Sequence, residues 1–197
     1  MNLSICKFDL KILEELTSEL LTIDRYYNLG IINKSSRGGI ELSDNPIIEN
    51  LRDSFELFNQ SINLTSFTYK EFDQDFQNLI NEDLKIPLKW TFPQILISNS
   101  LNSKFSAPPH KDSWILGPNA KGIVIWLPLS DQGRLNIFKG REGGTVKKDP
   151  YWGLKMAGEE YEKDENYNPI TIERGSALIF GHDIIHKSNP VKKGQVT

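Results

Sequence analysis

Cysteine is almost absent from this 197-residue sequence, since Cys6 is the only one. A single thiol excludes an internal disulfide and a zinc site built from several cysteines, so the chain must fold by burying an apolar core. This composition is typical of a protein from a reducing compartment. We therefore expect a cytoplasmic location.

Long apolar runs are missing as well, because no stretch approaches the ~18 consecutive apolar residues of a membrane helix. The N-terminal segment acquires acidic residues before any apolar run that could form a signal-peptide core. Charge of one sign is not in excess, since 23 basic residues stand against 26 acidic ones and the formal net charge is -3. We expect no membrane and no nucleic acid as a main partner, and composition leaves the oligomeric state open.

The remaining composition is ordinary for a globular protein, with 38% hydrophobic and 25% charged residues. The length predicts a single domain over residues 1–197. Apolar residues recur at helical spacing over 9–23, from 47 to about 61, and over 70–81. Residues 1–90 are therefore expected to be a mainly helical flank.

Short β-branched and aromatic runs bounded by turn residues follow this flank. The predicted strands are residues 94–98, 122–127, 134–138, 170–172, 177–180 and 184–185. Helices followed by a run of strands indicate an α+β fold with an antiparallel sheet or barrel at its centre. Residues 139–169 are polar, glycine-rich and too long for an ordinary connection, so we interpret them as a functional loop or lid.

The chain has three histidines, and two of them form a pattern with an aspartate. One residue separates His110 from Asp112, and in an extended backbone the side chains of two such positions point to the same face. His186 lies 74 residues after Asp112 (186 − 112), in the segment 181–188 that directly follows the apolar run 177–180. Two imidazoles and one carboxylate on an octahedral face form the site of non-haem Fe(II) oxygenases. An isolated His-x-Asp pair is more often a surface feature, and His182, four residues before His186, is interpreted as a turn or supporting residue.

Three segments carry a family resemblance: PPHKDSW (108–114), GIVIWLPLSD (122–131) and RGSALIFGHDIIHKSNP (174–190). They resemble the phytanoyl-CoA dioxygenase-like branch of the Fe(II)/2-oxoglutarate oxygenases over roughly residues 93–197. The resemblance implies a double-stranded β-helix, or jelly-roll, core over 91–197 with flanking N-terminal helices. It also implies that O₂ and 2-oxoglutarate are consumed, that succinate is formed, and that a small-molecule substrate is hydroxylated.

The family's functional residues can be carried onto matching positions. His110, Asp112 and His186 match the ligands of the Fe(II) ion. Trp126 matches an aromatic position near the co-substrate, and Ser188 matches a hydroxyl that contacts the 2-oxoglutarate carboxylate.

One family element has no match, namely an Arg about ten residues beyond the distal histidine that clamps the far carboxylate bidentately. No Arg occurs between His186 and Thr197. A sequence that stops before this Arg is the explanation we favour, with Lys192 or Lys193 as a weaker substitute. Two other functions stay open, a jelly-roll metal enzyme that does not use 2-oxoglutarate and a non-catalytic binding protein of the same fold. The identity of the substrate is open too.

Overall fold

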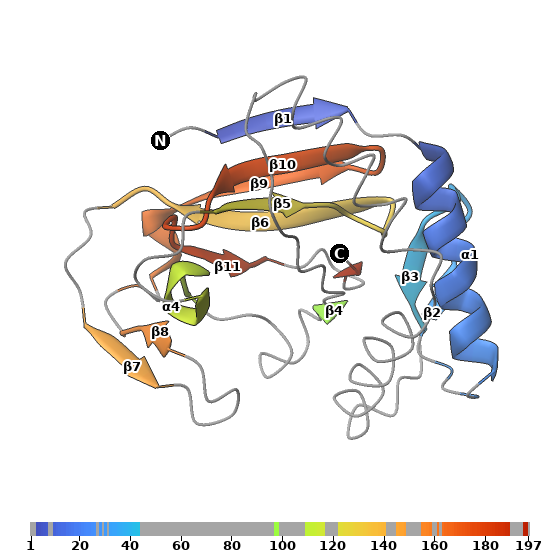
Figure 1. The fold of residues 1–197 in the computed structure, drawn as a ribbon, viewed down its shortest axis with the longest axis horizontal. Helices are drawn as coiled ribbons and strands as arrows, with labels where there is room; N and C mark the ends of the chain where they lie inside the picture. Colours follow the sequence, from blue (N-terminus) through green and yellow to red (C-terminus); the bar gives the residue numbers. More distant parts are fainter. Residues whose placement is uncertain are drawn as a thin grey trace.

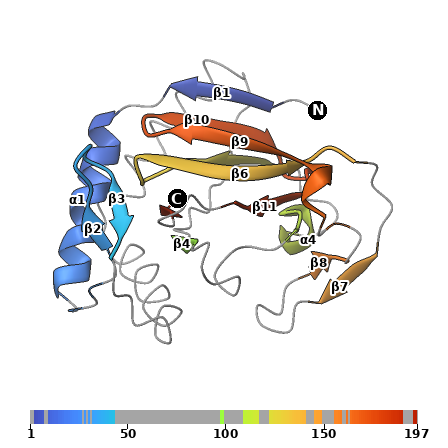
Figure 2. The same cartoon turned by 180° about the vertical axis from the view of Figure 1, so that it is seen from behind.

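The computed structural model describes residues 3–7, 10–26, 28, 30, 32–43, 97–98, 109–116, 122–140, 145–148, 155–158, 161, 163–189 and 195–196. Within these ranges the chain combines one long helix with antiparallel strands, which confirms the prediction of mixed helices and antiparallel sheets (Figures 1 and 2). The helices predicted near 47–61 and over 70–81 lie outside the described residues.

The helical segments are α1 (Leu10–Tyr26), α4 (Ser113–Leu116) and the 3₁₀ helix η4 (Asp164–Asn166). The strands are β1 (Leu3–Lys7), β2 (Ile32–Lys34), β3 (Ile40–Leu42), β4 (Ile97–Ser98), β5 (Ile123–Trp126), β6 (Gln132–Phe138), β7 (Val146–Lys148), β8 (Lys155–Ala157), β9 (Tyr167–Glu173), β10 (Ser176–Gly181), β11 (His186–Ser188) and β12 (Gln195–Val196).

The first three-stranded sheet has the order β1-β10-β5, with β10 in the centre and both pairs antiparallel. Residues 176–180 of β10 are all buried, as expected for a central strand with a neighbour on each side. Strand β1 was not predicted, because its five residues carry no periodic signal and its partner lies at the other end of the sequence. Strands β1, β2 and β3 were not anticipated within the predicted helical flank, and residues 44–90 lie outside the described residues.

The second three-stranded sheet has the order β11-β6-β9, again with antiparallel pairing. Side chains from both sheets form one buried cluster, which unites strands β5, β6, β9 and β10. Its members are Trp126, Leu135, Ile137, Ile172, Leu178 and Phe180. Burial of this shared apolar surface holds the two sheets together.

A glycine makes room for the largest side chain of this core. A Cβ atom at Gly133 would overlap the Trp126 ring and lie 3.0 Å from Cβ of Pro128. Because Trp126 is only 7% exposed, it has little space to move aside. We expect Gly133→Ala to lower the free energy of unfolding by about 1–3 kcal/mol, measured by urea denaturation. Gly181→Ala is the matched control, because a Cβ there meets nothing within 4 Å; equal losses would contradict the overlap.

Helix α1 lies beside the hairpin formed by β2 and β3 (Figure 1). It confirms the helix predicted over 9–23 and buries one stripe that includes Leu13, Thr17 and Leu20. Asp131, in the turn before β6, accepts hydrogen bonds from the Ser35 hydroxyl (2.6 Å) and the Gly39 N–H (3.1 Å). These bonds fix the hairpin to the sheets. No helix in the described part of the chain has the length and apolar composition needed to cross a membrane.

The strands predicted over 122–127, 134–138, 170–172 and 177–180 are confirmed as β5, β6, β9 and β10. Of the prediction over 94–98, only Ile97 and Ser98 are described, and they form β4. The prediction over 184–185 is wrong, since these residues lie in a turn and β11 begins at His186. Residues 139–169 are not one irregular loop either, because they contain β7 paired with β8, η4 and the start of β9.

Candidate metal centre

Two histidines from distant parts of the sequence face each other as a strand-like pair. The His110 N–H donates to the His186 carbonyl and the His186 N–H donates to the His110 carbonyl, both at 3.0 Å. Side chains of directly opposed residues leave the same side of the pair. The two imidazole centroids are accordingly 4.3 Å apart.

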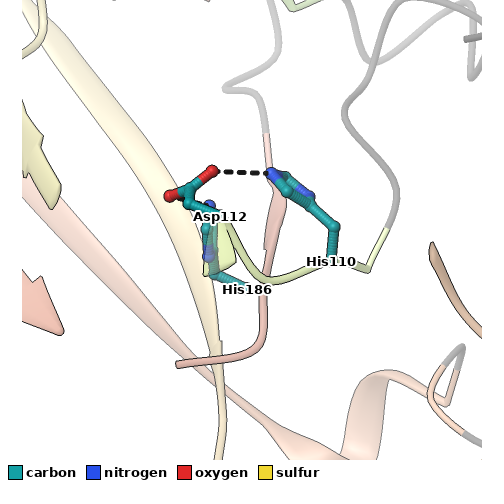
Figure 3. A group of neighbouring side chains, drawn as sticks. All are labelled: His110, Asp112 and His186. Carbon is teal, nitrogen blue, oxygen red and sulfur yellow. Dashed lines mark ion pairs between the residues drawn. The ribbon is translucent and has the colours of Figure 1, made fainter. Parts of the chain in front are cut away.

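Asp112 lies in a turn, and its carboxylate meets both imidazoles. Its Oδ1 is 3.7 Å from Nε2 of His110, and its Oδ2 is 3.9 Å from Nε2 of His186. Figure 3 shows the three side chains gathered around one point. The expectation of an extended backbone through His110 and Asp112 is wrong at Asp112, which lies in a turn and is followed by the four-residue helix α4.

The donor atoms fit a single small cation. One potential ligand atom from each residue can be chosen so that all lie within 4.8 Å of one another. Bonds of ~2.0–2.2 Å at right angles place neighbouring donors about 3 Å apart. The three side chains are close enough to one another for the group to hold a metal ion after side-chain adjustment.

The tautomer of His186 is suited to metal binding. Its Nδ1 lies 3.0 Å from the carbonyl oxygen of Ile184. A carbonyl can only accept, so Nδ1 carries the proton and the neutral ring offers the lone pair of Nε2 toward the shared point. A backbone carbonyl that fixes the ring of a ligand histidine is a recurrent feature of metal sites.

Burial without a bound cation disfavours the charged forms of His186 and Asp112, as their pKa values indicate. Burial, and next the charge of His110, lower the pKa of His186 to about 3, although the hydrogen bond to Ile184 acts in the opposite direction. Burial raises the pKa of Asp112, whereas the charges of His110 and His182 lower it. His186 therefore stays neutral at physiological pH, and a bound cation would stabilise the buried carboxylate.

Aromatic side chains cover one side of the site. The Phe180 ring meets the His186 ring edge-on with centroids 5.0 Å apart. A second buried cluster, formed by Phe138, Tyr161, Tyr167 and Ile185, lies next to it and has Trp114 packed against it. The Tyr167 hydroxyl donates to the Tyr161 carbonyl at 2.6 Å. These contacts hold Tyr161 and Tyr167 of segment 139–169 close to Ile185, the residue before His186, and to Trp114, two residues after Asp112.

The other predicted site residues have defined positions. Ser188 lies on β11 opposite Leu135. It follows His186 by two residues, so the side chains of His186 and Ser188 leave the same face of the strand. Trp126 packs in the core between the sheets. Their contacts with a co-substrate stay predictions. Lys192 and Lys193 lie outside the described residues.

Sequence reasoning did not identify the Ile184 carbonyl as the partner of the His186 ring. It also did not identify the contacts of His182 with Gly122 and Ser113. Backbone partners leave no signal in residue types, although the spacing of four residues between His182 and His186 was visible. A comparison of the sequence with protein-family models and with curated proteins finds no match in either.

Proposed function

We propose that this protein is a non-haem Fe(II)- and 2-oxoglutarate-dependent dioxygenase that hydroxylates a small-molecule metabolite. One observation carries the proposal: two imidazoles and one carboxylate from separate segments converge on one point. We further propose that the two three-stranded sheets are the faces of a double-stranded β-helix. Their antiparallel pairing and shared core support that fold.

The chain's residues define the coordination that this chemistry needs. His110, Asp112 and His186 would hold the ion and leave the rest of its coordination sphere open to a 2-oxo acid co-substrate. Two neutral imidazoles and one carboxylate leave a net positive charge on a divalent ion, which favours an anionic co-substrate. Bound Fe(II) would supply the oxidising chemistry, in which 2-oxoglutarate, O₂ and the substrate are converted to succinate, CO₂ and the hydroxylated substrate, with one oxygen atom of O₂ in each of the two oxidised products.

The far carboxylate of 2-oxoglutarate requires a basic partner. Lys187 is the basic residue nearest to His186 in the sequence, but alternate strand residues point to opposite faces. Its ammonium group pairs with Asp164 and lies 4.4 Å from the centroid of the Tyr167 ring. This leaves Lys192 and Lys193 among residues 187–197, which contain no Arg. The second candidate is a jelly-roll metal enzyme that does not use 2-oxoglutarate, since no side chain in the described residues is assigned to this carboxylate.

Succinate formation tests the proposal. The protein is incubated with Fe(II), ascorbate, 2-oxoglutarate and a metabolite library, and we expect succinate to form only when Fe(II), O₂ and 2-oxoglutarate are all present. His110→Ala should abolish this activity, because it removes a ligand from the metal. Metal binding without consumption of 2-oxoglutarate would favour the second candidate. Absence of metal binding would instead leave a non-catalytic protein of this fold.

A further inference from the structure

His182 is a buried imidazole beside the metal centre that does not belong to the ligand group. It is 7% exposed and begins the turn between β10 and β11. Buried polar side chains in proteins are almost always hydrogen-bonded. The partners of His182 therefore indicate what its burial achieves.

Three polar atoms of His182 bind two other segments of the chain. The backbone N–H of His182 donates to the Gly122 carbonyl at 3.3 Å, and its ring Nδ1 accepts the backbone N–H of Gly122 at 3.2 Å. Its carbonyl accepts the N–H of Ser113 at 3.1 Å. Gly122 immediately precedes β5, and Ser113 immediately follows Asp112. His182 thus joins the turn before His186 to the start of β5 and to the residue after Asp112.

These bonds hold the backbone on both sides of Asp112. On one side, His110 is paired with His186 through two hydrogen bonds; on the other, Ser113 is bound to His182. Both anchors come from the segment 182–186. Because an aspartate side chain is short, the position of its backbone sets where its carboxylate can reach. The placement of this segment therefore controls the distance from Asp112 to the ligand imidazoles.

The ring of His182 places that segment. The backbone N–H of Gly122 lies 3.2 Å from Nδ1 of His182, so the backbone at the start of β5 contacts the imidazole directly. Removing the imidazole would leave the Gly122 N–H without this acceptor and open space next to the turn.

We propose that His182 is a positioning residue, whose ring and carbonyl, through Gly122 and Ser113, hold the Asp112 carboxylate where the His110 and His186 imidazoles meet. The proposal rests on the metal centre of the proposed function, but on neither 2-oxoglutarate nor a substrate. The ordinary alternative is a buried histidine that stabilises the fold without influencing metal binding.

Calorimetric titration of the 197-residue chain with Co(II) separates these two roles. We expect His182→Ala to weaken Co(II) binding by about 10–100-fold, the range typical of residues that orient metal ligands. It should also change the visible absorption spectrum of bound Co(II), because the carboxylate is displaced. His182→Asn offers an acceptor near the position of Nδ1 and should recover most of the affinity.

A structural control comes from Ser35, a buried residue of the β2–β3 hairpin whose hydroxyl donates a hydrogen bond to Asp131. Ser35→Ala should lower the Tm of the metal-free protein and leave the Co(II) affinity unchanged. A His182→Ala variant that loses Tm but keeps wild-type affinity and spectrum would overturn the positioning role. If the wild-type protein binds no Co(II), the metal centre itself and the proposed function fail.

A second comparison covers the case in which His182→Ala does not fold. His182→Gln carries its amide at the distance of Nε2 instead of Nδ1, so it cannot replace the acceptor for Gly122 in the same place. Tight binding by His182→Asn together with weak binding by His182→Gln supports the proposal. Equal Co(II) affinities of these two variants and the wild type would contradict it.

Discussion

Replacing Asp112 by asparagine should weaken the binding of a divalent metal by more than about 100-fold, because loss of a ligand exceeds the effect of losing a supporting residue. Asparagine keeps the size of the side chain and removes the charge that a cation needs. Turnover should disappear with the metal. The measurement is Co(II) or Mn(II) titration followed by the succinate assay with Fe(II).

The same variant should make the metal-free protein at least as stable as the wild type. Burial raises the pKa of Asp112 above its ordinary value of 3.8. Between 3.8 and that raised pKa the folded state binds more protons than the unfolded state, so stability falls as pH rises through this window. The stability lost on ionisation of Asp112 stays lost at neutral pH, and an uncharged asparagine does not cause this loss. Urea unfolding at pH 7 in the presence of a chelator measures the difference.

Asp183→Asn is the matched control for Asp112→Asn. Its carboxylate belongs to the same turn as His182, but it is 73% exposed and is not part of the candidate ligand group. We expect metal affinity to be unchanged in this variant. Asp112→Glu should also weaken binding, because one more methylene moves the carboxylate away from the shared point. Wild-type affinity in Asp112→Asn would refute the assignment of this residue as a ligand.

The metal-free protein should lose stability in acid through His186, the second large effect. The folded-state pKa of His186 is about 3 and its ordinary value is 6.5. Between these two pH values the unfolded state binds a proton that the folded state does not, so stability rises with pH across this window. One such group contributes at most about 1.4 kcal/mol per pH unit. Asp112 acts in the opposite direction above pH 3.8, which makes a difference measurement necessary.

His186→Asn provides that difference measurement. The asparagine amide retains a donor for the Ile184 carbonyl but does not titrate. With a chelator present, the free energy of unfolding of the wild type should fall more steeply than that of the variant as the pH is lowered from about 6.5 toward 3. Parallel curves for the wild type and His186→Asn would contradict a buried neutral imidazole.

Local patterns in the sequence determined the elements whose signals are short in range. The helical spacing of Leu13 and Leu20 predicted α1, and the apolar runs predicted β5, β6, β9 and β10. The identities of His110, Asp112 and His186 were also accessible, because few residue types provide metal ligands and the chain has only three histidines.

Only the tertiary structure decided how these elements meet. Strand β1 pairs with β10 across almost the whole chain, and no local period encodes such a partner. Asp112 joins the imidazoles through a turn instead of a strand, because the segment 182–186 binds the backbone on both sides of it. The sequence thus determined which side chains could bind a metal, whereas hydrogen bonds between distant segments, most of them between backbone groups, decided where those side chains converge.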